Sequence, residues 1–590
     1  MKFKLILLLA FLSTNLFFAQ KEIQFEITDI PQSKSKYIGL RGDTYPLSWD
    51  KTLFLEKKGE FYCKSIKFKN DVTKIEYKYV LDDGTNVEWE SIQNRHEFIT
   101  NEKQSFKSKW NVEKSIDVSA LPKLTVKQLM EDYTVISNTI RKVHPGLYRY
   151  NDSTSIKQNL EILKRSFQRP LTYAETFLAM SKFISTIQCD HTSVSFYNQE
   201  ATTNSLIHFQ SDKVPFTFKW LQNKMIITNN ASESNLLEKG TEVISINNIP
   251  VSKILATLLP YISADGATKQ NKISKAEVDG YSFRFSAFDV LYPLLFPIKE
   301  NQLTLEIISP DNHKAIQVKV ATTARTERSE SLSKRYSHFP ESPEDLWEYK
   351  ILENNIGYLK IGSFATNNFK KDWKLMLENA FNDLKKNKVE DLILDIRENQ
   401  GGRDDTSYEL EKYIYKNDVV TDGLQSQSRF LEFPDDVKPH ITTWDYWFYN
   451  LKDDTHFKNG IYYVFPKNLE IKTIKQSRTT FQGNIYLLTS AKNVSGAFYL
   501  ARLFKKGKSG TLIGQETGGN QNGINGGAIL FFKPPNSRIN INLPVMGTFS
   551  TEAFPNKGIE PDIQVVNTVS DIVNNSDTTL NKAIEIINKS

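Results

Sequence analysis

The sequence predicts a multidomain chain with an amino-terminal β-sandwich, a helical subdomain, a second β-rich domain and a carboxyl-terminal α/β core. Polar and apolar residues alternate over residues 20–113, which is typical of strands that bury one face. Apolar residues recur at helical spacing over residues 124–182, and strand patterns alternate with helix patterns from Ile356 onward. The 590 residues also exceed what one hydrophobic core normally holds, so we expect several domains.

The composition is that of ordinary globular material. The chain is 39% hydrophobic and 24% charged, and its formal net charge of +6 is spread along the sequence. Because there is no basic block, nucleic acid is not an expected partner. Cys63 and Cys189, the only two cysteines, fall in different expected domains, so we predict two free, buried thiols. No residue pattern indicates a metal or another cofactor.

The first residues have the pattern of a secretory signal peptide. Met1–Ala19 combines Lys2 and Lys4 with the apolar run Leu5–Leu12, and this run is too short to span a membrane. No cysteine lies near the expected cleavage site, which argues against a lipid anchor. No later apolar stretch reaches spanning length. We therefore expect an exported protein, periplasmic or secreted, without a stable membrane span.

Residues 20–113 contain short alternating strands with frequent turns, as expected for a β-sandwich. The phrases Gly39–Gly42, Ser48–Asp50 and Val87–Glu90 resemble a family 20 carbohydrate-binding module of the starch-binding type. The resemblance implies that Trp49 and Trp89 form a platform on which the glucose rings of an α-glucan stack. It also implies the polar contacts Lys78, Glu90 and Asn94. The alternative is a spacer sandwich with both tryptophans packed inward.

The helical subdomain is expected over residues 118–200. Leu129, Tyr133, Ile136 and Ile140 recur at helical spacing, and a similar series follows from Ile156. Two histidines end helical stretches in this region. His144 precedes a Pro-Gly break, and His191 lies in the phrase Cys-Asp-His-Thr. Both histidines are candidates for a base, although a lone histidine is more often structural.

A second β-rich domain is expected over residues 201–325. The phrase Gly240–Val251 resembles the strand-and-turn core of a PDZ domain, and the insertion Leu258–Pro297 departs from the compact form of that family. The resemblance implies a degenerate PDZ-like domain that either binds an extended peptide by strand addition or acts as a structural wedge. The polar, charge-rich segment Ala321–Trp347 is expected to be a linker.

The α/β core is expected over residues 345–570, followed by a tail at 571–590. The apolar run Ile485–Leu488 predicts a buried strand, and Ser495 and Gly496 follow it where a helix begins. Amides at such a junction can bind a developing oxyanion, whereas the alternative role of the serine is a helix N-cap. Glycines 401 and 402 follow a second buried strand. The long segment Gly402–Pro466 is expected to be a lid or a wall of a cleft.

Four motifs of this core occur in one order over about a third of the chain. They read LILDIRENQGG, LTSAKNVSGA, GQETGG and GIEPDI, and together they resemble the S41 serine peptidases, the family of carboxyl-terminal processing and tricorn core peptidases. The resemblance implies a ClpP/crotonase-like α/β core with Ser495 as the nucleophile. It also implies that the amides of Gly496 and of Gly401 or Gly402 form the oxyanion hole.

The residue that follows the third motif distinguishes two branches of the family. Processing proteases carry a lysine there as the base, but this chain has Asn520, a neutral amide that cannot act as a base. Tricorn-like members take a histidine from a phrase similar to the one at His191, so the resemblance implies His191 rather than His144. Glu552 is the nearest candidate for the carboxylate that orients the histidine, and Asp190 is a second one.

The sequence therefore predicts an exported serine peptidase that cleaves peptide bonds in peptides or proteins by acyl-enzyme chemistry, as an endopeptidase or a carboxyl-terminal peptidase. Many relatives carry glutamate at the position of Phe498, which leaves the level of activity open. One alternative is a catalytically decayed S41 scaffold that binds a glycan or another ligand. A hydrolase that acts on a different acyl bond is the other alternative.

Overall fold

The computed structural model describes residues 20–589 apart from 32–36, 73, 91, 93, 100, 113–116, 280–285, 337–338, 341, 368, 417, 421–423, 444–445, 466–472, 475–479 and 551. The expected leader, residues 1–19, lies outside the described residues. The chain divides into two compact units, one comprising residues 1–116 with 200–205 and the other 117–199 with 206–590. Within the described part, none of the helices has both the length and the apolar character of a membrane span. Cys63 and Cys189 are buried and free.

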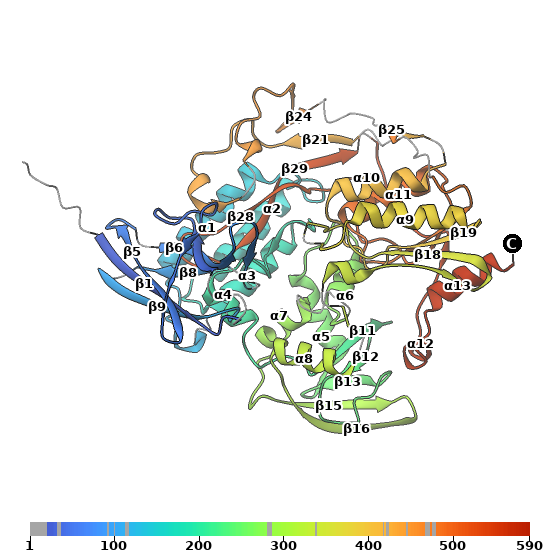
Figure 1. Cartoon of the computed structure of the whole chain (residues 1–590), viewed down its shortest axis with the longest axis horizontal. Helices are drawn as coiled ribbons and strands as arrows, with labels where there is room; N and C mark the ends of the chain where they lie inside the picture. Colours follow the sequence, from blue (N-terminus) through green and yellow to red (C-terminus); the bar gives the residue numbers. More distant parts are fainter. Residues whose placement is uncertain are drawn as a thin grey trace, which may run out of the picture. The chain divides into compact units, whose positions relative to one another are not determined.

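The amino-terminal unit contains two β-sheets over one hydrophobic core (Figure 1). The first sheet, in spatial order, is β4 (Glu56–Lys58), β5 (Phe61–Lys69), β1 (Gln20–Thr28) and β9 (Lys103–Lys109). The second is β3 (Leu53–Phe54), β2 (Ile38–Gly42), β6 (Lys74–Asp82) and β7 (Val87–Trp89), with β8 (Arg95–Phe98) also paired to β6. Alternate residues of β1, Ile23, Phe25 and Ile27, are fully buried, so the alternating pattern does form a sandwich.

Three helices follow as the sequence predicts, each with a side chain that caps its first turn. They are α1 (Val126–Val143), α2 (Ser153–Ser166) and α3 (Tyr173–Ser185), capped by Thr125, Asp152 and Thr172. The short strand β10 (Ser193–Val194) comes next and pairs antiparallel with β29 (Ile541–Ser550), far along the chain. Helix α4 (Ala201–Ile207) then precedes the second β-rich region. The turn between α3 and β10, which holds His191, is thus fixed at both ends.

The PDZ-like region, which is named for the resemblance of its sequence to a PDZ domain, is an antiparallel sheet with helices between its strands. Its strands, in spatial order, are β11 (Phe216–Leu221), β12 (Lys224–Asn230), β13 (Glu242–Ile246), β15 (Gln302–Ser309) and β16 (Asn312–Ala321), with β14 (Ile249–Pro250) beside β13. Its helices are α5 (Val251–Leu258), the 3-10 turn η3 (Leu259–Tyr261), α6 (Lys269–Lys275) and α7 (Ala287–Leu295).

The expected linker after this region is a folded element, so the linker prediction is wrong. Residues Arg325–Arg335 form helix α8, and the guanidinium of Arg328 is fully buried. It forms an ion pair with Asp289 of α7 at 3.0 Å and donates to the carbonyl of Val214. A charge-rich segment looks solvated in sequence, because its buried partner lies elsewhere in the chain.

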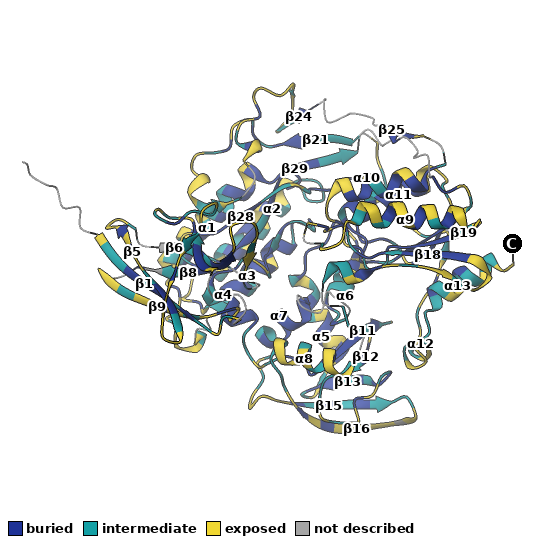
Figure 2. Ribbon diagram, in the orientation of Figure 1, coloured by how far each residue is buried: buried dark blue, intermediate teal, exposed yellow. Residues whose placement is uncertain are grey.

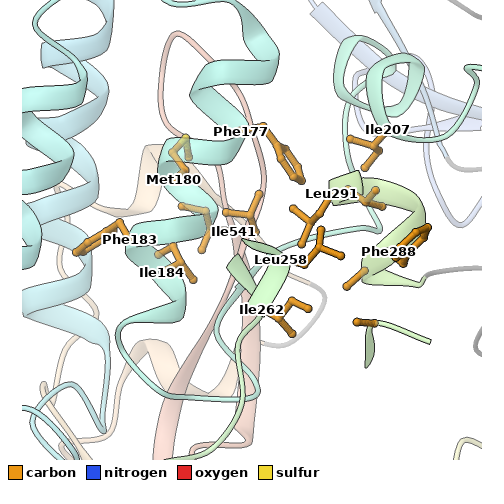
Figure 3. Close-up of a cluster of buried hydrophobic side chains, with 14 of the residues drawn as sticks. Phe177, Met180, Phe183, Ile184, Ile207, Leu258, Ile262, Phe288, Leu291 and Ile541 are labelled. Carbon is orange, nitrogen blue, oxygen red and sulfur yellow. The ribbon is translucent and has the colours of Figure 1, made fainter. Parts of the chain in front are cut away.

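The helical subdomain and the PDZ-like region share one hydrophobic core. Side chains from α3, the segment around Leu258 and Ile262, α7 and β29 meet in a single cluster (Figure 3). Phe177, Met180 and Ile184 contribute to it from α3. Because of this packing, the region before His191 and the PDZ-like insertion cannot shift independently of each other.

The carboxyl-terminal core is a mostly parallel sheet with helices on both faces (Figure 1). Its order is β17 (Trp347–Leu352), β18 (Ile356–Ile361), β19 (Asp391–Asp395), β26 (Asn484–Thr489), β27 (Thr511–Gly514) and β30 (Ile563–Gln564), and only β17 is antiparallel to its neighbour. Leu392 and Leu394 of β19 share a hydrophobic cluster with helices α9 (Trp373–Lys386), α10 (Asp404–Ile414) and α11 (Ser495–Lys506). The side of α9 that faces away from the sheet is exposed (Figure 2).

The opposite face of the sheet is covered by the segment that the sequence suggested as a tail. Residues 571–590 contribute helix α13 (Thr578–Ile587), which follows the short helix α12 (Val569–Val573). Ala583 of α13 is fully buried against Ile393 of β19 and its neighbours. The tail prediction is therefore wrong, because the apolar stripe of α13 completes the core.

The segment Gly402–Pro466, expected to be a lid or a wall of a cleft, adds strands to a second sheet. This sheet has the order β22 (Ile441–Thr442), β28 (Gly527–Phe532), β29, β21 (Leu424–Ser428), β24 (Tyr462–Phe465) and β23 (Phe457–Asn459), with β10 also paired to β29. A separate small pair joins β20 (Val419–Val420) to β25 (Thr473–Ile474). Strand β29, which pairs with β10 and so fixes the turn of His191, therefore belongs to the same sheet as the strands of this segment.

Candidate active site

Ser495 lies at the carboxyl-terminal edge of the parallel sheet, where β26 turns into α11. It is the first residue of α11, and the N-cap position belongs to Val494, which makes no side-chain capping bond. The N-cap alternative for Ser495 is therefore wrong. Its φ of 52° lies in the left-handed region, which few serines occupy and which costs conformational energy. A serine held in this way on a sharp strand-to-helix turn is a candidate nucleophile.

The structure brings His191 to this serine from the helical subdomain. The Nε2 atom of His191 lies 3.4 Å from Ser495 Oγ, although 304 residues separate the two in sequence. The turn that holds His191 is closed by the amide of Thr192, which donates to the carbonyl of Cys189 at 3.1 Å. The distance is within reach of a general base, since such hydrogen bonds are often long before substrate binds.

The competing histidine has a structural role. His144 is fully buried, and its Nδ1 accepts a hydrogen bond from the amide of Gly146 at 3.1 Å. Its Nε2 must therefore carry the proton and donate to Thr192 Oγ1, 2.8 Å away. Burial, with a smaller effect of Arg149, lowers the pKa of His144 to about 3. Both ring nitrogens are occupied, so His144 supports the turn that carries His191.

The two glycines after β19 lie against the nucleophile. A Cβ atom on Gly401 would approach Ser495 Cβ to 2.7 Å, and one on Gly402 would collide with the backbone of Phe364. The amide of Gly401 donates to Asn399 Oδ1 at 2.8 Å, so the predicted role of this amide in the oxyanion hole is wrong. Among the described residues, the amides of Gly402 and Gly496 have no protein acceptor. These two are the remaining candidates for oxyanion donors.

Buried side-chain amides connect the loops that bear the motifs. Asn493, which is fully buried, accepts a hydrogen bond from the amide of Ser490 and donates to the carbonyl of Asn399. The amides of Gly518 and Gly519 in the third motif donate to the carbonyl of Asn493 at 2.9 and 3.1 Å. Three of the four motifs thus build one scaffold around Ser495, and each supplies a different loop.

Two positions that depart from the family pattern are filled by structural residues. The side-chain amide of Asn520, fully buried, donates to Asn556 Oδ1 at 2.7 Å and accepts from the amide of Asn522. Phe498 is fully buried and packs so tightly on Gly519 that a Cβ there would lie 2.4 Å from its ring. Neither residue offers a group that could exchange a proton with Ser495.

The carboxylates suggested by the sequence do not reach the histidine. Glu552 is exposed, and no hydrogen bond or ion pair joins it to His191 in the described part of the chain. Asp190 forms an ion pair with Lys275 of α6. A third carboxylate, Asp265, lies in the PDZ-like insertion and is 1% exposed. Sequence reasoning missed Asp265, since the only signal was an acidic residue in a turn of the unexplained insertion.

A cavity of about 560 Å³ opens beside His191 and Gly401. Part of its wall is apolar, contributed by Val194, Phe196, Ile262, Leu346 and Ile529. Cavities of this size accommodate small ligands or a few side chains of a longer one. The wall combines residues of the helical subdomain, the PDZ-like insertion and the core, so all three define what can bind next to Ser495.

The two tryptophans expected to form a sugar platform lie next to each other in the amino-terminal unit. The rings of Trp49 and Trp89 lie side by side with centroids 6.1 Å apart and planes tilted by 43°, and Trp89 is 39% exposed. The guanidinium of Arg41 lies over Trp89 at 5.3 Å from the ring centroid. The two tryptophans are therefore not packed inward as a pure spacer would require.

The polar residues implied for this platform differ in burial and in their hydrogen-bond partners. Glu90 is 1% exposed and binds Arg95 at 2.6 Å while accepting from the amide of Tyr79, so its predicted sugar contact is wrong. A buried, paired carboxylate is held by the fold and not offered to a ligand. Asn94 is half-buried and donates to Glu76 at 2.7 Å. Lys78 is half-buried and lies opposite Arg41 in the sheet register.

Comparisons with known proteins agree with the geometry of the core. Residues 355–565 match the family model described as peptidase family S41. The fold is similar to that of mature CPAF complexed with lactacystin, at 14% identity and a TM-score of 0.54 over 78% of this chain and 97% of CPAF. A second structure of mature CPAF gives 14% identity and a TM-score of 0.53 over 76% and 94%. No curated protein matches the chain. Residues 355–565 of the chain are therefore similar to the peptidases of family S41.

Proposed function

We propose that this protein is an exported peptidase that cleaves peptide bonds through an acyl-enzyme, with Ser495 as the nucleophile and His191 as the base. The observation that carries the proposal is the 3.4 Å distance between His191 Nε2 and Ser495 Oγ, where Ser495 lies in the region that matches peptidase family S41. The strained φ of Ser495 and the close contact of Gly401 add support, because both hold the hydroxyl in one place.

In the proposed mechanism, His191 takes the hydroxyl proton while Ser495 Oγ attacks the carbonyl carbon of the scissile bond. The amides of Gly402 and Gly496 then donate to the oxyanion of the tetrahedral intermediate. Collapse of this intermediate expels the amine, which receives the proton from His191, and leaves the acyl group on Ser495. Water, activated by the same histidine, hydrolyses the ester and restores the serine.

The nucleophile and the base come from regions joined by packing rather than by adjacency in sequence. His191 follows α3, whose apolar side chains belong to the shared core of the helical subdomain and PDZ-like insertion (Figure 3). A displacement of about 1 Å between reacting groups costs on the order of a hundredfold in rate. We therefore expect activity to depend on this core as well as on the catalytic side chains.

The proposed peptidase is either an endopeptidase or a carboxyl-terminal peptidase. Analysis of peptide fragments by mass spectrometry distinguishes an endopeptidase, which releases internal fragments, from an enzyme that removes carboxyl-terminal residues.

Export rests on the leader pattern of Met1–Ala19. Fractionation of expressing cells, with sequencing of the mature amino terminus, tests that pattern directly. A protein that retains Met1 in the cell interior would contradict export.

A second function is proposed for the amino-terminal unit, namely weak binding of α-glucans. It rests on the adjacent rings of Trp49 and Trp89 and on the exposure of Trp89. Flat aromatic faces match the C–H faces of glucose rings, and Lys78 and Asn94 are the polar groups that the proposal assigns to the same site.

A fluorophosphonate probe tests the catalytic proposal. Mass spectrometry is expected to find the probe on Ser495 in the wild-type protein and to find none in His191→Gln. His456→Gln is a matched control, because His456 Nδ1 contacts the carbonyl of Asp454 and its ring lies against Tyr463 and Phe465 of β24, a strand outside the parallel sheet of the core. If the folded wild-type protein is not labelled on Ser495, the decayed-scaffold alternative replaces the proposal. Labelling together with cleavage of esters but no peptides would favour the other hydrolase alternative.

A further inference from the structure

Asp265 is an interior carboxylate that the proposed mechanism does not yet use. It lies in the turn between η3 and α6 and is 1% exposed. Its Oδ1 accepts a hydrogen bond from the amide of Asp190 at 2.8 Å. The next residue, Gly266, donates its amide to the carbonyl of Gln188 at 3.1 Å. These two bonds attach the carboxylate to the turn that carries His191.

Two buried polar atoms in this neighbourhood lack partners. Among the described residues, neither Asp265 Oδ2 nor His191 Nδ1 makes a hydrogen bond. One is an acceptor, and the other is a donor whenever the histidine carries its proton on Nδ1. An unpaired polar atom in the interior costs free energy, so a hydrogen bond between these two atoms would stabilise the folded protein.

The charges around Asp265 favour a partner of this kind. Burial, followed by repulsion from Asp190, raises the pKa of Asp265 to about 6, while His191 opposes the rise. The other ionisable groups that face it are Arg149, Tyr150, Cys189 and Tyr499. The charge of Asp190 is already compensated by Lys275. Asp265 is thus the carboxylate near His191 whose charge still needs a partner.

Resting on the function proposed above, we infer that Asp265 is the positioning residue of His191 and binds its Nδ1 proton, directly or through one water. This bond selects the tautomer whose Nε2 lone pair faces Ser495 Oγ, as a general base requires. The structure does not record the bond, and catalytic hydrogen bonds commonly tighten only when substrate is bound. The PDZ-like insertion would then complete the site rather than act only as a wedge.

Asp265→Asn is the sharpest test, because the asparagine keeps Oδ1 as the acceptor for the amide of Asp190. Its Nδ2 replaces the acceptor Oδ2 with a donor, which favours the wrong histidine tautomer. The rate of fluorophosphonate labelling is expected to fall by about 10²–10⁴-fold. The midpoint of the residual rate should also move to lower pH, since a nearby carboxylate stabilises the imidazolium and raises the pKa of histidine.

The matched control is Glu411→Gln in α10. Glu411 is also 1% exposed, with one oxygen bonded to Ser407 and the other without a partner among the described residues. It differs from Asp265 in having no contact with the turn of His191, so its labelling rate and pH profile are expected to match the wild type. An equal loss in both variants would identify a general effect of buried carboxylates and overturn the inference.

A second measurement tests the inference without relying on Asp265→Asn or on catalysis. In ¹⁵N-histidine spectra of the full-length protein, with His191 assigned through His191→Gln, the wild-type ring is expected to carry its proton on Nδ1. A proton on Nε2, or unchanged labelling by Asp265→Asn, would overturn the inference. If wild-type Ser495 does not react at all, the proposed function fails, and the spectrum alone still decides whether Asp265 holds His191.

Discussion

Asn493 Nδ2 donates to the carbonyl of Asn399 at 3.0 Å, and this bond joins the loop of the nucleophile to the loop of the two glycines. Asn399 in turn accepts from the amide of Gly401 and donates to the carbonyl of Ile361. The position of Gly401 behind Ser495 is therefore set by two buried asparagine side chains. Neither asparagine touches the reacting atoms, yet both define where those atoms lie.

Asn493→Ala tests this relationship. The substitution leaves the amide of Ser490 and the carbonyl of Asn399 without their side-chain partner in the interior. Buried polar groups left unpaired cost roughly 1–3 kcal/mol each, so we expect the free energy of unfolding to fall by at least that amount. Denaturant titration measures the loss, and probe labelling of Ser495 should slow at least tenfold in the folded variant.

The control for this prediction is Asn484→Ala at the start of β26. Asn484 is exposed, and its side chain donates to Asp391 at 3.0 Å. Its substitution is expected to change the free energy of unfolding by no more than about 0.5 kcal/mol. A similar loss at both positions would mean that the buried amide has no special role.

Gly401→Ala should displace the nucleophile directly. The new Cβ would lie 2.7 Å from Ser495 Cβ, and φ at this position is +95°, so the loop must move or strain. We expect labelling of Ser495 to fall at least tenfold. Gly460→Ala is the control, because Gly460 also has a positive φ, +58°, but no atom lies within 4 Å of its added Cβ. Equal effects would show that backbone strain, and not the contact with Ser495, is responsible.

The alternation of strands and helices in the core could be predicted because local signals agree with one another. Buried apolar runs end in glycine or serine turns, and neighbouring parallel strands β19 and β26 bring these turns to one edge of the sheet. The motifs around Gly401 and Ser495 are therefore expected at the same edge of the sheet. His191 required the family resemblance as well, because no local pattern indicates a contact across 304 residues.

The features that sequence reasoning missed depend on how side chains pair in the folded chain. Arg328 looks solvated until Asp289 is placed beside it, and Glu90 looks available until Arg95 binds it. Asp265 has no motif around it, and only folding attaches its carboxylate to the amide of Asp190. Pairing of buried charges is a property of the tertiary structure, which a single sequence does not display.

The stability of the protein should depend on pH through Glu411. Burial raises the pKa of Glu411 to about 7, from its ordinary value of 4.5. Between these values the folded state holds a proton that the unfolded state has lost, so stability falls as pH rises from about 4.5 to 7. The wild type should lose roughly 3 kcal/mol of unfolding free energy over this range relative to Glu411→Gln, measured by denaturant titration at each pH. Parallel curves for the two proteins would contradict the assignment.

Trp89→Ala should remove most of the α-glucan binding proposed for the amino-terminal unit. Trp89 is the more exposed partner of Trp49, and stacking on two rings should give micromolar affinity at best, about −8 kcal/mol. Titration of the full-length protein with maltooligosaccharides, followed by tryptophan fluorescence, measures the binding. Trp447→Ala serves as the control, because Trp447 is 50% exposed but lies in the peptidase unit. Absence of a signal in the wild type, or equal losses in both variants, would reduce the sandwich to a spacer.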